Sequence, residues 1–153
     1  MARAPFQVLV LPYRRHMGRV EYAAFRRADN DAWQGVAGGG ENDETPRDAA
    51  IREMREEAGI TSTDTLRQLD AVGTIGVEHF HDRHSWDAAL REIPEYAFGV
   101  AVDGSDISLS SEHCEIAWLT FEEALVRLVW ESNRIALREL HDRLSVVPDA
   151  NFA

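Results

Sequence analysis

The amino-acid sequence predicts an α/β or α+β domain built around a mixed β-sheet. Segments rich in β-branched and aromatic residues alternate with segments whose apolar residues recur at helical spacing. Such interleaving is typical of a sheet covered by helices. The 153 residues suit one domain, residues 1–153, with a substantial core. The 44% of apolar and 28% of charged residues are typical of folded rather than disordered chains.

The strands are predicted from runs of β-forming residues bounded by turn residues. We expect strands at residues 6–13, 20–26, 33–36, 66–77, 96–102 and 116–119. A turn over residues 14–18 joins the first two. A glycine run, Gly38 to Gly40, follows the third strand and is expected to form a loop that leads into a helix.

The first helix has clear start and stop signals. Thr45 suits the N-cap, Pro46 the first helical position and Asp48 a capping box, and Gly59 stands where helices commonly end. A second capping box, Thr120 with Glu123, opens a further helical region. We expect residues 132–133 to interrupt that region before it resumes over residues 135–144. Residues 79–94 lack a period and are expected to form a long loop, a kind of segment that is often functional.

The charge balance narrows the class of partner. Sixteen Lys and Arg against 27 Asp and Glu give a net charge of −11, which argues against a nucleic-acid polymer as the main partner. A small phosphorylated ligand remains compatible, because a divalent cation reverses the local field. No long apolar stretch predicts a signal peptide or a membrane span. The single cysteine, Cys114, cannot form an internal disulfide, so we expect a cytoplasmic location.

Three glutamates of the first helix, Glu53, Glu56 and Glu57, fall within about 100° of one another on its surface. Each like-charge pair at this spacing opposes the helix by about 0.2–0.5 kcal/mol. The cluster is either a solvated acidic face relieved by neighbouring arginines or a site for Mg²⁺ or Mn²⁺. The preceding glycines either cradle phosphate or make a tight turn. Glu41, Asp43 and Glu44 would repel a bare phosphate and favour one that arrives with metal.

The same segment resembles the signature of a known family. The matching positions are Gly38, Glu44 and then Arg52-Glu53-Met54-x-Glu56-Glu57-x-Gly59-Ile60. Their identities and spacing reproduce every fixed position of the Nudix box, although Asp43 stands where many members have glycine. The resemblance implies an α/β/α sandwich around a mixed sheet. It also implies hydrolysis of a nucleoside diphosphate linked to another moiety.

Shorter matches resemble one branch of that family, the dihydroneopterin triphosphate and dATP pyrophosphohydrolases. They are Trp33-Gln34, Ser111-Glu112-His113, Trp118-Leu119 and Trp130-x-Ser132-Asn133. This resemblance implies cleavage of a pterin or (deoxy)nucleoside triphosphate to the monophosphate and pyrophosphate. The alternatives are hydrolysis of another nucleoside diphosphate derivative and a Nudix-fold module that senses a nucleotide without cleaving it. The sequence leaves a monomer and a homodimer equally open.

The family resemblance also implies roles for individual residues. Glu53, Glu56 and Glu57 are expected to bind Mg²⁺, with Mn²⁺ as a substitute, and Glu53 either binds metal or helps to activate water. Arg52 is expected to form a supporting salt bridge with Glu44.

Glu112 is the candidate general base and a further candidate metal ligand, with an exposed loop carboxylate as the equal alternative. The implied substrate-binding residues are Trp33, Gln34, Gly38, Gly39, Trp130, Ser132 and Asn133. For both tryptophans, packing in the core is the competing interpretation.

Overall fold

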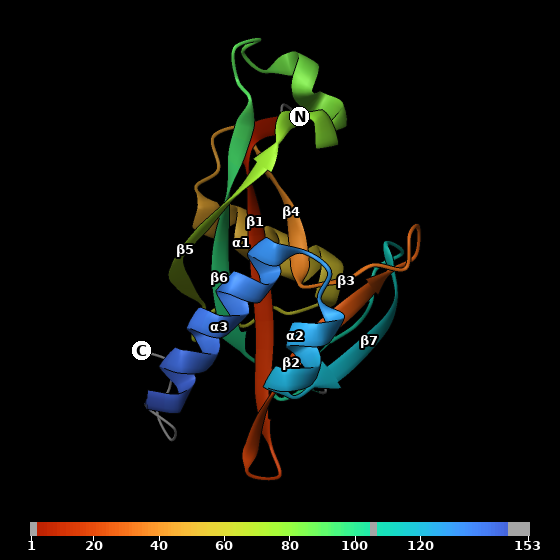
Figure 1. Ribbon diagram of the computed structural model, residues 1–153, viewed down its shortest axis with the longest axis vertical. Helices are drawn as coiled ribbons and strands as arrows, with labels where there is room; N and C mark the ends of the chain where they lie inside the picture. Colours follow the sequence, from red (N-terminus) through yellow and green to blue (C-terminus); the bar gives the residue numbers. More distant parts are fainter. Residues whose placement is uncertain (1–2, 105–106, 147–153) are drawn as a thin grey trace.

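A computed structural model describes residues 3–104 and 107–146 and confirms the mixed sheet (Figure 1). Within these residues one sheet has the order β3-β2-β1-β6-β5, with β4 paired to β1 and β7 paired to β2. The β1–β6 pair is parallel and the other pairs are antiparallel. The strands are β1 Arg3–His16, β2 Arg19–Arg27, β3 Trp33–Gln34, β4 Val36–Glu41, β5 Arg67–Gly76, β6 Glu92–Ala101 and β7 His113–Leu119.

Helices cover both faces of the sheet, as expected for an α/β/α sandwich. They are α1 Pro46–Ala58, α2 Phe121–Arg127 and α3 Glu131–Val146. Figure 1 shows α2 and α3 in front of the sheet and α1 behind it. Alternate residues of β1 separate the two cores, because Val8 and Val10 pack toward α1 whereas Leu9 and Leu11 pack toward α2 and α3. None of the described helices combines the length and apolar character needed to cross a lipid bilayer.

The first helix begins and ends where its local signals predict. The Thr45 hydroxyl accepts a hydrogen bond from the Asp48 amide at 3.1 Å, and Pro46 is the first helical residue. Gly59 ends the helix with a φ of +69°, a left-handed conformation that favours glycine. The face that carries Met54 and Ala58 is buried against the sheet. This seat turns Glu53 and Glu57 toward β4 and the segment before β7.

The glycine run is not a loop, which corrects one expectation. Gly38 and Gly39 lie in β4, opposite Val8 and Gln7 of β1 in an antiparallel ladder. Pairing with β1 extends the strand to Glu41, so the chain turns only at residues 42–45 before α1 begins. Neither a phosphate-cradling loop nor a tight glycine turn is present at this point.

The break between the last two helices does not lie at residues 132–133, where the sequence predicts it. It falls at residues 128–130, whereas Asn133 lies in the first turn of α3. Asn133 is buried there, and its side-chain oxygen accepts a 2.9 Å hydrogen bond from the Gly35 amide. This bond to the β3–β4 connection places the residue inside the helix, against its usual preference for turns.

The segment predicted as a long loop is more ordered than expected. Two short 3₁₀ helices, η1 Val77–His79 and η2 His81–Ser85, occupy its first part, and β6 begins at Glu92. The Trp86 indole donates a 2.8 Å hydrogen bond to the Arg3 carbonyl, which ties the segment to the start of β1.

We expect Met54→Ala to destabilise the fold by about 2–5 kcal/mol, because it leaves a cavity where α1 meets the sheet. Urea denaturation followed by circular dichroism would measure the free energy of unfolding. As a control, Val126→Ala truncates an 88% exposed side chain of α2 and should change that free energy by less than about 0.5 kcal/mol. Equal transitions for the two variants would contradict the proposed seat of α1.

Candidate active site

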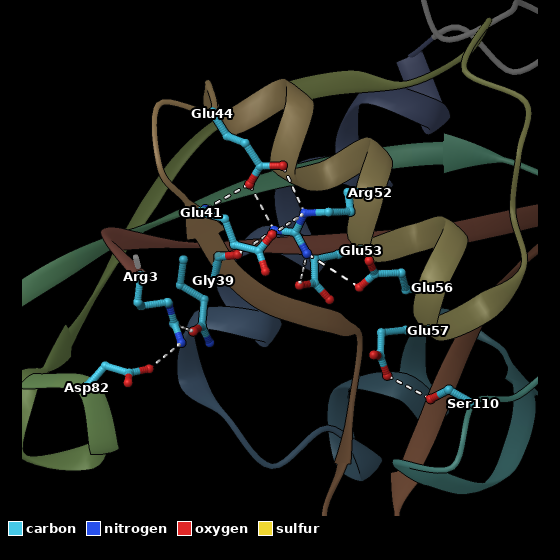
Figure 2. Close-up of polar contacts among 11 residues, drawn as sticks. Arg3, Gly39, Glu41, Glu44, Arg52, Glu53, Glu56, Glu57, Asp82 and Ser110 are labelled. Carbon is cyan, nitrogen blue, oxygen red and sulfur yellow. Dashed lines mark hydrogen bonds and ion pairs between the residues drawn. The ribbon is translucent and has the colours of Figure 1, made fainter. Parts of the chain in front are cut away.

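Three carboxylates of α1 meet at one place beside β4 (Figure 2). Ligand oxygens of Glu53, Glu56 and Glu57 all lie within 4.8 Å of one another. Glu53 and Glu57 are buried, whereas Glu56 is exposed. The spacing of three and four residues explains the convergence, since such side chains share one helix face. The cluster is therefore not a solvated acidic face, because two of its three members are out of water.

Burial makes the negative charge of this cluster costly. Burial raises the pKa of Glu53, and a hydrogen bond from Arg52 opposes the rise. Burial also raises the pKa of Glu57 to about 7, an effect that the Ser110 hydroxyl opposes and the Glu112 carboxylate increases. In both residues burial is the largest cause, so the charged carboxylate is disfavoured unless a cation joins it. An oxygen-preferring divalent cation fits this donor set.

One guanidinium holds the cluster in place. Arg52 donates to both carboxylate oxygens of Glu44 at 2.8 and 2.9 Å, and to Glu53 at 2.8 Å. Arg52 also donates to the Gly39 carbonyl at 2.8 Å and to Glu56 at 3.4 Å, and it forms an ion pair with Glu41 at 3.4 Å. The bonds to Glu44 raise the pKa of Arg52, and they hold the pKa of Glu44 below its usual value. The salt bridge between Arg52 and Glu44 that the family resemblance implies is present.

Glycine at position 38 makes room for this arrangement. A methyl group there would overlap the Glu53 carboxylate, so only glycine lets that side chain lie flat against β4. Gly38 thus borders the cluster from strand β4, and the adjacent Gly39 reaches it through its carbonyl, which accepts from Arg52.

The segment before β7 closes the other side. The Ser110 hydroxyl donates to Glu57 at 2.8 Å, and the His113 Nδ1 lies 3.5 Å from the same carboxylate. The His113 ring is buried, and neither ring nitrogen has a hydrogen-bond partner within residues 3–104 and 107–146. Burial lowers the pKa of His113. Glu112 is exposed, and its charge acts on both Glu53 and Glu57. Glu112 thus lies near the cluster, but it does not belong to the group of Glu53, Glu56 and Glu57 whose ligand oxygens lie within 4.8 Å of one another.

Four of the expected substrate-binding residues gather at the start of α3. The Trp130 indole donates to the Gln34 side chain at 3.2 Å, and the Asn133 amide lies 3.5 Å from the Ser132 hydroxyl. Trp130 is 48% exposed, so one side of its ring is free of the core. Trp33 differs, because its ring packs against the core and the Arg127 guanidinium covers it at 4.9 Å.

A polar row that the sequence did not single out joins the two regions. The Arg3 guanidinium donates to the Gln7 side chain at 2.9 Å, and the Gln7 amide lies 3.5 Å from Glu95. Glu95 is only 4% exposed, and burial raises its pKa against the hydrogen bonds of Ser132 and Gln7. The row runs along the α3 side of β1 and β6. No local signal marks it, since its members belong to distant strands.

The comparisons with known proteins agree with this architecture. The family model of the NUDIX domain matches residues 6–140. Dihydroneopterin triphosphate diphosphatase of Haemophilus influenzae is 31% identical over 134 residues, 86% of this chain and 84% of the relative. The Escherichia coli protein of the same name is 32% identical over 139 residues, 90% of this chain and 92% of the relative.

Solved structures give the same result. A NUDIX hydrolase from Listeria monocytogenes superposes with a TM-score of 0.83 at 35% identity, covering 94% of this chain and 97% of that one. The Escherichia coli dihydroneopterin triphosphate pyrophosphohydrolase gives a TM-score of 0.71 at 26% identity, covering 98% of this chain and 99% of that one. Since the family model spans most of the chain and these relatives align along nearly all of it, the chain belongs to the Nudix hydrolase family.

Proposed function

We propose that this chain is a Mg²⁺-dependent pyrophosphohydrolase that cleaves dihydroneopterin triphosphate, or a (deoxy)nucleoside triphosphate, to the monophosphate and pyrophosphate. The carboxylate cluster of α1, whose three side chains converge and of which Glu53 and Glu57 are buried, carries this proposal. The two relatives named for dihydroneopterin triphosphate support the substrate, because they align over 86% and 90% of this chain.

Glu53, Glu56 and Glu57 would hold the metal. When bound, a divalent cation neutralises phosphate oxygens and lowers the pKa of a water ligand. Carboxylate oxygens suit both Mg²⁺ and Mn²⁺, so Mg²⁺, which commonly shares its coordination shell with substrate phosphates, is the proposed ion and Mn²⁺ a substitute. Arg52 holds the Glu53 and Glu56 side chains next to each other. It has no N–H group left to bind the substrate directly, because all of them are bonded to the protein.

Glu112 would act as the general base. Its carboxylate is exposed and adjoins Glu57, so it can accept the proton of an attacking water. A phosphorus–oxygen bond to that water forms, an anhydride bond breaks, and the pyrophosphate leaves with the electron pair. Ser110 fixes the Glu57 carboxylate through its 2.8 Å hydrogen bond. Positioning and charge stabilisation would supply most of the rate.

The ring of the substrate would lie at the start of α3. Trp130 offers a partly exposed stacking surface. Gln34, Ser132 and Asn133 stand beside it as hydrogen-bonding side chains.

Assays with Mg²⁺ on a panel of substrates test the proposed reaction. The panel comprises dihydroneopterin triphosphate, the common (d)NTPs, ADP-ribose and a dinucleoside polyphosphate, with pyrophosphate and phosphate measured separately. We expect pyrophosphate from the pterin triphosphate or dATP and little product from the others. EDTA should abolish turnover, and Mg²⁺ should restore it better than Mn²⁺.

Other outcomes would correct the proposal at different levels. Turnover of ADP-ribose or the dinucleotide alone would retain the hydrolase and replace its substrate. Binding of a nucleotide without any turnover would instead indicate a sensing module.

Replacing Glu56 with glutamine should lower kcat by at least about a hundredfold, because it removes a charged metal ligand. The exposed position predicts an unchanged melting temperature. Glu122→Gln removes the same charge from an exposed position of α2 and serves as the control. Unchanged metal-dependent turnover in Glu56→Gln would remove this residue from the site.

The variant Glu112→Gln should lose about a hundredfold in kcat while it still binds Mg²⁺, because general-base catalysis contributes a factor of this order. Single-turnover kinetics and metal titration would separate the two effects. If metal affinity falls as much as the rate, Glu112 is a ligand rather than the base. A wild-type rate would make it a bystander.

A further inference from the structure

Arg3, the first residue of β1, lies beside the active site with hydrogen-bonding capacity to spare. Its Nε is buried and has no hydrogen-bond partner among the described residues. Its Nη1 makes only a 4.0 Å ion pair with the half-exposed Asp82, while Nη2 donates to Gln7 at 2.9 Å. A buried donor without an acceptor is costly, so such groups call for an explanation.

The second glycine of β4 provides the seat of this guanidinium. A methyl group on Gly39 would overlap Arg3, whereas a methyl group on Gly38 would overlap Glu53 on the other face of the strand. Adjacent glycines of one strand thus admit a cation on one side and a carboxylate on the other. In Figure 2 the Arg3 guanidinium lies next to Gly39, on the side of the site away from Glu57.

The other arginines that act on the clustered carboxylates are already committed. Arg52 spends its N–H groups on carboxylates and on the Gly39 carbonyl. Arg27, whose charge acts on Glu57, forms a bidentate pair with Asp29 at 2.8 Å for both bonds. Arg3 acts on Glu53, and among the described residues its Nη1 makes only the 4.0 Å ion pair with Asp82, so Nη1 rather than the buried Nε is available to a ligand.

Contacts from the opposite side hold Arg3 in this place. The Phe80 ring lies 5.1 Å from its guanidinium carbon, and the Trp86 indole donates to its backbone carbonyl at 2.8 Å. These contacts hold the start of β1 and cover one face of the guanidinium with the Phe80 ring. They leave its N–H edge to Gln7, Asp82 and the neighbourhood of Gly39.

We propose that Arg3 binds a non-bridging oxygen of the substrate's phosphate chain through its Nη1, across Gly39 from the glutamates proposed to hold the metal. A planar guanidinium can donate two hydrogen bonds to phosphate oxygens. A polyphosphate carries more negative charge than one divalent cation can neutralise, so a second positive group is useful. The inference rests on the proposed function and adds a substrate-binding residue to that site. It also gives Gly39 a role, which is to make room for this cation.

The variant Arg3→Gln tests the contact. We expect KM for the triphosphate to rise about ten- to a hundredfold with kcat nearly unchanged, because a contact common to substrate and transition state is lost. The salt dependence of KM should also weaken, which a purely structural role would not cause. Arg3→Lys should recover part of the affinity. The control Arg138→Gln removes the same charge from an exposed position of α3.

A double-mutant cycle ties the effect to the glycine. Gly39→Ala should raise KM as Arg3→Gln does, since the added methyl group displaces the guanidinium. In the Arg3→Gln background the same alanine should add little, because the two changes remove one contact. Independent, multiplicative effects on KM would overturn this link.

Calorimetry with inorganic tripolyphosphate and Mg²⁺ separates this inference from the reaction. Wild type should bind the probe, and Arg3→Gln should bind it about ten- to a hundredfold more weakly at an equal melting temperature. Equal affinity in both, or no binding by wild type, would overturn the inference even if the pyrophosphohydrolase reaction is confirmed. Conversely, a loss of affinity would support it even if every substrate of the panel remained intact.

Discussion

The site depends on the Arg52 guanidinium, which compensates the repulsion between the carboxylates around it. Glu44, Glu53 and Glu56 all accept hydrogen bonds from this one side chain. The Gly39 carbonyl accepts another, so the same group joins α1 to β4. Without that link, like charges at helical spacing would separate toward water. The carboxylate face of α1 is therefore held by a cation that belongs to the protein, the Arg52 guanidinium.

Strand β4 contributes to the site chiefly because its residues Gly38 and Gly39 have no side chain. Gly38 admits the Glu53 carboxylate on one face and Gly39 admits the Arg3 guanidinium on the other, so the strand is a thin partition between opposite charges. Antiparallel pairing with β1 holds these two glycines in an extended conformation. A flexible glycine loop could approach a phosphate equally closely, but it would not hold the two side chains in register. The extended strand thus serves preorganisation better than the loop that the glycine content suggested.

The sequence predicted correctly those features that depend on interactions between residues close together in the chain. Thr45, Pro46 and Gly59 mark the ends of α1 because capping depends on neighbours within a few residues. The convergence of Glu53, Glu56 and Glu57 follows from helix geometry alone. The conformation of the glycines and the place of Asn133 depend instead on partners in β1 and at Gly35, which no window of sequence contains. Ser110 was missed for the same reason, since its partner Glu57 lies 53 residues away.

Three segments other than α1 carry the remaining residues of the proposed site. Arg3 arrives with the start of β1, Ser110 and Glu112 with the segment before β7, and Trp130 with the start of α3. Only the glutamates and Arg52 belong to one continuous element. In the proposed site, α1 thus carries the groups for the chemical step, whereas the other segments carry the groups that contact the substrate. On the proposed function, a change of substrate would therefore need substitutions at the start of β1 and near the start of α3, with α1 left intact.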